Sequence, residues 1–291
     1  MTHLARRFAF PALLAFTITS LLAVSSLADT GTDEQREQKT FALRSGGTLV
    51  LKHERGRVSV QGWDKDQVVV DVVKRYEGGS TAERDEWLRD TKVNFTSESG
   101  RLEIEVERAN RFCIGICYSG RGTVDLTIHA PRKVQLDIHE SRADLQVTDI
   151  EGDLRLRNER SSVQVERLTG GVRIESERGP VRLRDVNVRG DFDVSVERAE
   201  FEFQGSGLPR GGRVQSERGD VVLRLPENVA LNVEVNTDRR SSFRSDFPIA
   251  TTTSYNSEKL RGTVNGGGPL LRLESTRGPV RLLRYVSPGR M

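Results

Sequence analysis

The chain has 291 residues, of which 35% are hydrophobic and 30% are charged, and its formal net charge is +3. This balance of charges excludes a disordered tail of one sign, and two cysteines exclude a disulfide-dense scaffold. Four histidines leave little material for a His-rich metal site. The length allows one large all-β domain or two smaller ones.

The first 28 residues have the layout of an export signal. Two arginines precede an apolar stretch from Phe8 to Val24, and small side chains at Ser26 and Ala28 provide a cleavage site. We predict a signal peptide over residues 1–28, with an uncleaved membrane anchor as the alternative. Its removal takes away two arginines and no acid, which lowers the net charge to +1. The arginine pair leaves the general secretory and twin-arginine routes both open.

The mature chain is expected in the periplasm or at the cell surface. No later stretch reaches the roughly 18 apolar residues that a membrane span needs, so no span is expected after cleavage. Its near-zero net charge gives no reason to expect a nucleic-acid partner. In this oxidising compartment Cys113 and Cys117 can form a local disulfide, and a redox or metal pair is the alternative.

A short Glu-Arg-Gly-like phrase recurs along the chain. Its central copies start at residues 140, 159, 177, 197 and 217, so the steps between them are 18 to 20 residues. Self-similarity at a fixed spacing indicates stacked units. The arginines of the repeated phrase are Arg55, Arg142, Arg160, Arg178, Arg198, Arg218 and Arg277, and all but Arg55 are candidates for binding.

Apolar residues alternate with polar ones on both sides of each phrase, which indicates strands with one buried face. We predict an all-β fold, a right-handed parallel β-solenoid-like stack with two sheets and one short helix. An antiparallel meander of hairpins is the alternative. In the solenoid Val163 lies beside Val181, whereas in the meander Ile174 faces Val181.

Stacked strands also predict columns of outward side chains. Asp137, Arg157 and Glu175 are expected to form one column of alternating sign. The arginines of the phrase are expected to form a ladder of like charge, neutralised by the neighbouring glutamates. Such a ladder also suits an anionic polymer, although a salt-bridged, solvated surface is the more ordinary interpretation.

The region before the repeats predicts three strands and then a helix from Ser80 to Thr91. Ser80 and Glu83 form a capping box, and Ala82, Trp87 and Leu88 are expected to face inward. The predicted division is a signal peptide over 1–28, a flexible segment over 29–41, an N-terminal β module over 42–130, β-solenoid repeats over 131–285 and a tail over 286–291.

The repeat rhythm breaks at about residues 239–265, a Ser/Thr-rich stretch that contains Phe243, Phe247 and Tyr255. This insertion either crosses the edge of the stack or covers the backbone of its last unit. Its three aromatic residues, with the arginines of the phrase, are the candidates for binding a partner or polymer.

Several segments, read in order, carry a resemblance to a known family. They are "GGTLVLKHERGRVSVQGWDKDQVVVDVV", "GRLEIEVER", "TVDLTIHAPRKVQLDIHESRADLQVTDIEGDLRLRNERSSVQV" and "GGGPLLRLESTRGPVRL". The chain resembles the DUF4097 putative-adhesin family, also called toast-rack repeats, over residues 42–285. The resemblance implies an exported β-solenoid of the cell envelope with no known catalytic residues and with a role in scaffolding or stress sensing.

The sequence therefore favours a non-catalytic envelope scaffold that acts in adhesion-like interactions or stress sensing. Its expected partner is an envelope protein or an anionic envelope polymer, and no cofactor or metal is expected. A polymer-binding module built on the arginines is the first alternative. A glycan-active β-helix enzyme that uses Asp191, Asp193 or Asp144 is the second.

Overall fold

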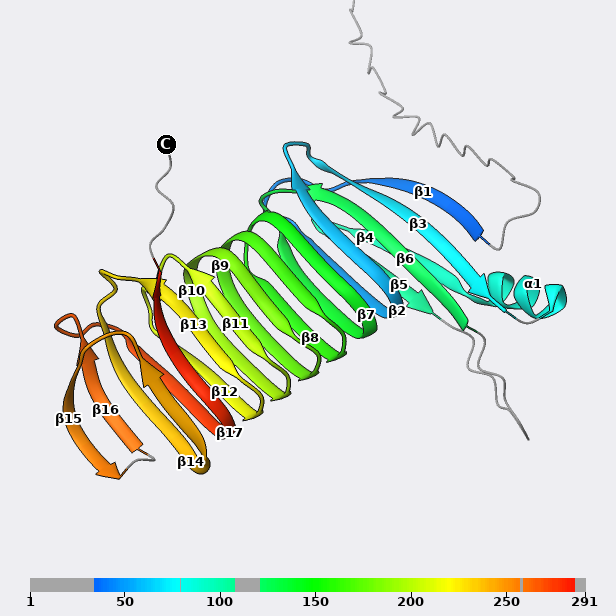
Figure 1. Cartoon of the computed structure of the whole chain (residues 1–291). Helices are drawn as coiled ribbons and strands as arrows, with labels where there is room; N and C mark the ends of the chain where they lie inside the picture. Colours follow the sequence, from blue (N-terminus) through cyan, green and yellow to red (C-terminus); the bar gives the residue numbers. More distant parts are fainter. Residues whose placement is uncertain (1–33, 79, 108–120, 257–258, 286–291) are drawn as a thin grey trace, which may run out of the picture. The chain divides into compact units, whose positions relative to one another are not determined.

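The computed structural model describes residues 34–78, 80–107, 121–256 and 259–285. They all belong to the second of two compact units, residues 32–291. Over these residues the chain forms seventeen strands and one helix (Figure 1). No helix in this part is long and apolar enough to cross a membrane. The predicted signal peptide, the cysteine pair and the predicted tail lie outside the described residues.

Like segments of the repeat lie on one another as parallel strands. Leu154 pairs with Val172, which pairs with Phe192. Val163 pairs with Val181, as the stacked arrangement predicts, and the meander is therefore wrong. The strands of the central repeats are β7 (Gln135–Glu151), β8 (Leu154–Arg160), β9 (Val163–Arg178), β10 (Val181–Arg198), β11 (Phe201–Gly205), β12 (Gly212–Arg218) and β13 (Val221–Pro226).

Each rung of the stack has two arms that meet at a corner, and the repeated phrase forms this corner. In β7 the strand continues through the corner, so its first arm lies before Arg142 and its second arm after it. The sequence predicts two separate sheets. Because several strands run through their corners, all seventeen strands instead belong to one continuous hydrogen-bonded sheet.

The core lies between the two arms of the rungs. In β8, Leu154 and Leu156 are buried whereas Arg155 and Arg157 are exposed, as alternation along a strand requires. The buried side chains form one cluster that runs from Leu43 to Leu282. Each fully buried valine or leucine contributes about 1.5–3 kcal/mol of transfer free energy, so the stacked aliphatic layers are the main stabilising term.

The N-terminal module supplies the first full rung. Strand β2 (Thr48–Trp63) pairs with β7 along both arms, with Leu49 beside Leu136 and Val58 beside Leu145. Its first arm is followed outward by β5 (Arg101–Glu107) and β4 (Lys92–Glu98). Its second arm is followed by β6 (Arg121–Pro131), β3 (Gln67–Glu77) and β1 (Glu34–Ala42).

Strand β1 corrects the prediction of a flexible segment over residues 29–41. It pairs antiparallel with β3 along its whole length, from Glu34 opposite Arg75 to Ala42 opposite Gln67. Its sequence is mostly polar, so alternation gave no strand signal. It is ordered because it satisfies the open backbone edge of β3.

Helix α1 (Thr81–Asp90) follows β3. Ser80 caps it, and the predicted capping box with Glu83 is present. Trp87 packs beside the ring of Tyr76, with the ring centroids 5.7 Å apart. Ala82 is exposed, contrary to the prediction, because the helix makes its main contact through Trp87 alone.

The last rungs do not follow chain order. Strand β17 (Leu270–Tyr285) lies between the rung of β12 and β13 and the outer strand β14 (Leu231–Ser245). The predicted insertion is therefore shorter than expected, since residues 239–245 belong to β14. The rest forms an antiparallel hairpin of β15 (Ile249–Asn256) and β16 (Lys259–Val264). Strand β16 pairs with the first arm of β14 and covers its backbone.

Candidate binding surface

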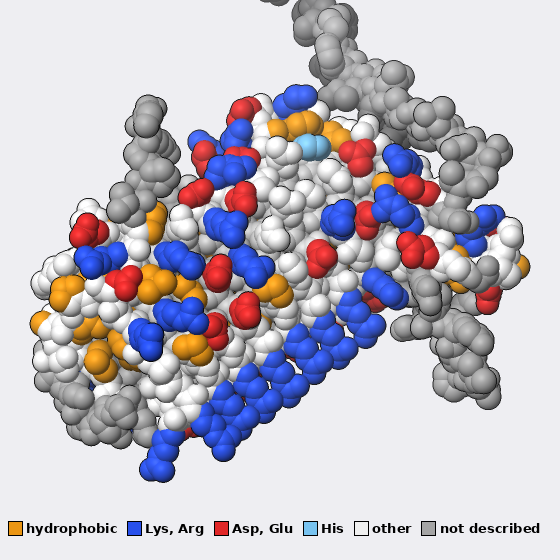
Figure 2. Space-filling model, in the orientation of Figure 1, with side chains coloured by type: hydrophobic (Ala, Val, Ile, Leu, Met, Phe, Trp, Pro, Cys, Tyr) orange, Lys and Arg blue, Asp and Glu red, His pale blue; other side chains and the backbone are white. Residues whose placement is uncertain are grey.

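The arginines of the repeated phrase form one column along the corners of the stack. Arg178 pairs with Arg160 on one side and with Arg198 on the other, and Arg218 pairs with Arg198 and Arg277. Figure 2 shows an unbroken row of basic side chains along one edge of the molecule. In spatial order the Arg column is Arg55, Arg142, Arg160, Arg178, Arg198, Arg218, Arg277 and Arg240.

The Arg column ends in Arg55, which belongs to the first copy of the phrase, and in Arg240, which belongs to no copy. Arg55 pairs with Arg142 because β2 is itself a full rung. Arg240 pairs with Arg277 because β14 lies outside β17. Adjacent strands lie about 4.8 Å apart, so the seven steps of the column span about 34 Å.

The Arg column is not neutralised from within the chain. None of its eight side chains has an ion pair or hydrogen bond with any residue that the structure describes. Other exposed arginines do have such partners, for example Arg157 with Glu175 at 3.4 Å and Arg167 with Asp149 at 2.8 Å. The expected neutralisation by the neighbouring glutamates is therefore wrong.

The physical reason is the direction of the side chains. Consecutive residues of an extended chain point to opposite sides, so the glutamate that directly precedes five of these arginines faces away from it. The other three arginines, Arg142, Arg277 and Arg240, follow Ser141, Thr276 and Arg239. Within the described part of the chain these glutamates form no ion pair either. We call Glu54, Glu159, Glu177, Glu197 and Glu217 the Glu column.

A column of like charge carries a cost. Like charges directly opposite on adjacent strands destabilise a sheet. Two unit charges about 4.8 Å apart in water repel by roughly 0.9 kcal/mol before salt screening. Other columns mix signs, as where Glu166 lies beside Arg184. The uniform sign of the Arg column is therefore a feature that stability alone does not explain.

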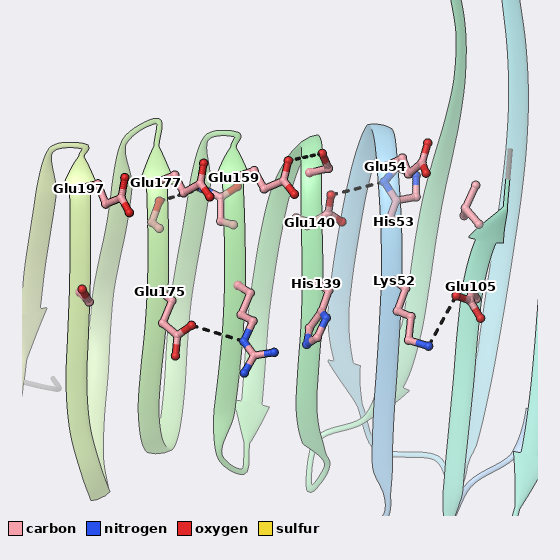
Figure 3. Close-up of a pocket in the computed structure, with 16 residues that line it drawn as sticks. Lys52, His53, Glu54, Glu105, His139, Glu140, Glu159, Glu175, Glu177 and Glu197 are labelled. Carbon is pink, nitrogen blue, oxygen red and sulfur yellow. Dashed lines mark hydrogen bonds and ion pairs between the residues drawn. The ribbon is translucent and has the colours of Figure 1, made fainter. Parts of the chain in front are cut away.

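Four members of the Glu column line a groove of about 610 Å³ on the outer side of the first arms, and Glu217 lines a second groove further along the stack. Figure 3 shows Glu54, Glu159, Glu177 and Glu197 in a row at the bends of the rungs; the rung of β7, between Glu54 and Glu159, carries Ser141 at this position. Lys52 lies lower in the groove, 2.8 Å from Glu103, and this pair holds the pKa of the Glu103 carboxyl below its usual value. The groove is thus mainly acidic, on the opposite side of the corner from the Arg column.

A buried pair of titratable side chains, a histidine and a carboxyl group, lies beneath this groove. Nδ1 of His53 is 3.4 Å from a carboxylate oxygen of Glu140, and both side chains are fully buried. Nε2 of His53 donates to the Val124 carbonyl at 2.7 Å, so Nδ1 is left to share a proton with Glu140. Burial raises the pKa of Glu140, and His53 opposes this shift. No sequence pattern predicts this pair, because its members lie on different rungs.

Buried polar residues hold the corners that present the Arg column. Nδ2 of Asn158 donates to the Ser161 carbonyl at 2.9 Å, to the Ser176 hydroxyl at 3.0 Å and to the Arg178 carbonyl at 3.2 Å. Serines take the same place on three other rungs, at Ser176, Ser216 and Ser275, whereas Val196 takes it on the rung of Arg198. Ser275 donates to the Gly278 carbonyl at 3.0 Å. These bonds fix the backbone at several of the corners from which the arginines project.

The predicted aromatic residues are not presented as one surface. Phe247 is only 4% exposed and belongs to the core, which corrects its place among the binding candidates. Phe243 is half-buried and packs against the same core. Tyr255 lies in β15, and its side chain is outside the described part. Cys113 and Cys117 are likewise outside it.

The mixed column differs from expectation. Asp137 pairs with Arg155, whereas Arg157 pairs with His139, so Asp137 does not share a column with Arg157. His129 stacks on Trp63 at 5.3 Å on a second arm, away from His139 on a first arm. No group of three or more metal-ligating residues is present among the described residues.

No model of a known protein family matches the chain, and no curated protein matches it either. The resemblance to DUF4097 therefore stays a prediction. Solved structures of similar fold include a putative cell adhesion protein from Clostridium sporogenes, 11% identical, which covers 86% of this chain and 100% of that one with a TM-score of 0.38.

Two further structures of similar fold come from Parabacteroides. A putative adhesin from Parabacteroides merdae is 8% identical, covers 87% of this chain and 97% of its own, and has a TM-score of 0.41. A putative lipid binding protein from Parabacteroides distasonis is 8% identical, covers 87% of this chain and 98% of its own, and has a TM-score of 0.36.

Proposed function

We propose that the protein is an exported, non-catalytic binding scaffold that holds an anionic polymer of the cell envelope along its Arg column. The scaffold is a right-handed parallel β-solenoid of the DUF4097 kind. The observation that carries the proposal is the column itself. It contains eight positively charged arginines, one per rung, and none of them has an ion pair to any described residue. Their mutual repulsion is relieved when anions lie between them.

The guanidinium group suits this role. It presents a planar fork of donors that matches carboxylate, sulfate and phosphate groups, and its charge does not depend on pH in the physiological range. The arginines project at equal spacing from a stiff sheet, so the backbone is already ordered before the ligand binds. The polymer therefore meets a preformed array of donors.

The acids considered for a glycan-active enzyme lie beside polar or basic partners of the stack, Asp193 between Arg173 and Arg213 on the neighbouring strands. Asp144 accepts a hydrogen bond from the Ser162 backbone at 3.3 Å. Asp191 is exposed and lies 4.0 Å from Arg173. These positions support a scaffold in preference to a hydrolase.

The proposal is tested with the mature chain and fluorescently labelled polygalacturonate. One variant replaces four members of the Arg column with glutamine: Arg160→Gln, Arg178→Gln, Arg198→Gln and Arg218→Gln. The control replaces four other exposed arginines that have no ion pair to described residues: Arg155→Gln, Arg184→Gln, Arg189→Gln and Arg210→Gln. Both variants lose the same charge, and circular dichroism verifies their folding.

We expect the wild type and the control to bind with an affinity that falls steeply as salt rises. The column variant should lose most of this binding and most of its salt dependence. Equal binding by the two variants would show that the Arg column is not the binding surface.

A further inference from the structure

The Arg column is a narrow strip of positive charge. On one side it is bounded by the Glu column, most of whose side chains face the acidic groove. On the other side the next residues are small. Two residues beyond the arginine, three rungs carry an acid: Asp144, Glu200, which lies 3.9 Å from Arg182, and Asp220, which pairs with Arg281; the rung of Arg55 carries Arg57 there.

The width of the strip sets the width of its ligand. A ligand one chain wide can lie along the arginines without approaching the acids on either side. A duplex or a flat anionic membrane would bring its outer anions close to the Glu column, whose carboxylates have no ion pair to any described residue, so that like charges repel. The Glu column therefore selects against broad anionic surfaces while leaving a single chain unaffected.

The column is also continuous, because strand pairing sets every step. No rung between Arg55 and Arg240 lacks its arginine. A chain lying across the rungs gains one more contact with each rung it reaches, until all eight arginines are used. Tethered contacts of this kind raise affinity with ligand length, and the gain ends when the array is filled.

We infer that the ligand of the Arg column is a single, unbranched anionic chain that lies lengthwise along the stack with its anions spread over successive rungs. This inference rests on the proposed function and specifies its ligand class. If this inference is right, binding depends on an uninterrupted run of arginines. Diffuse attraction to a basic surface would depend only on the total charge.

The first test uses two variants of equal charge and an oligogalacturonate with four carboxylates. The middle variant, Arg178→Gln with Arg198→Gln, divides the column into two runs of three arginines. The end variant, Arg277→Gln with Arg240→Gln, leaves six consecutive arginines. We expect the middle variant to bind the short probe several-fold more weakly than the end variant, which should resemble the wild type.

An oligogalacturonate with eight carboxylates is the matched second probe. It covers the whole column, so both variants should weaken its binding by similar factors. Equal effects of the two variants on the short probe would refute lengthwise binding but leave the Arg column as a polyanion site. Unchanged binding of both probes in both variants, and in the fourfold column variant, would refute the proposed function itself.

The second test varies the width of the ligand. The wild type is titrated with linear inorganic polyphosphate, with duplex DNA and with vesicles that contain anionic phospholipid. We expect polyphosphate to compete with the oligogalacturonate, and the duplex and vesicles to compete poorly at equal charge concentration. Competition by vesicles or duplex as strong as that by polyphosphate would refute the single-chain ligand.

Discussion

Asn158 provides a direct test of how the corners present their arginines. The residue is 3% exposed, and its amide makes four hydrogen bonds at the corner. A typical hydrogen bond contributes about 0.5–1.5 kcal/mol, and groups left unsatisfied in a buried place cost more. Asn158→Ala should therefore destabilise the stack by about 3 kcal/mol.

The structure also predicts the order of three substitutions at this site. Asn158→Ser should be the mildest, because other rungs carry serine here and Ser275 caps its own corner carbonyl. Asn158→Asp should be the worst at neutral pH, because a carboxylate would face the carbonyls of Ser161 and Arg178. Acid should relieve this variant, since a protonated carboxyl can donate.

The assay is urea unfolding followed by circular dichroism, at neutral pH and near pH 4. For a loss of about 3 kcal/mol, the midpoint should move by roughly 1 M urea. An Asn158→Asp variant as stable as the wild type at neutral pH would refute this account of the corner. So would an Asn158→Ala variant with an unchanged midpoint.

Three further predictions concern the same corners. Gly179→Ala should cost roughly 2 kcal/mol or more in urea unfolding, because φ there is +94° and a Cβ would collide with the Ser161 carbonyl oxygen; Ala199→Gly, at the equivalent position, should be mild by comparison, and equal effects would contradict the explanation. Glu140→Gln should match the wild type below about pH 4.5 and become the more stable protein as pH rises, because burial raises the pKa of Glu140 and its ionisation costs the fold stability above that pKa; a constant difference across pH would contradict this. Arg178→Gln should raise the thermal midpoint slightly at low salt, because it removes repulsion within the Arg column. It should leave the midpoint unchanged near 1 M salt, where the Debye screening length is roughly 3 Å; a lowered midpoint at low salt would show that the arginines of the column do not repel one another.

Local pattern was enough to predict the repeating part of this protein. Alternation of apolar and polar residues in segments such as Leu154–Leu156 specifies which face of the strand is buried, because successive side chains of a strand point to opposite faces. The constant step between copies of the phrase places Arg160, Arg178 and Arg198 at equivalent corners. Ser80 and Glu83 specify the start of the helix by local hydrogen bonds.

Tertiary structure alone decided which strands became neighbours at the two ends. Any rung offers the same backbone edge, so nothing local determines that β17 lies inside β14, or that the polar β1 pairs with β3. That choice adds Arg240 to the Arg column. Burial of His53 against Glu140 depends in the same way on β2 lying beside β7. Sequence thus determined the rung and its charges, whereas the order of rungs arose from long-range pairing that only the folded chain can satisfy.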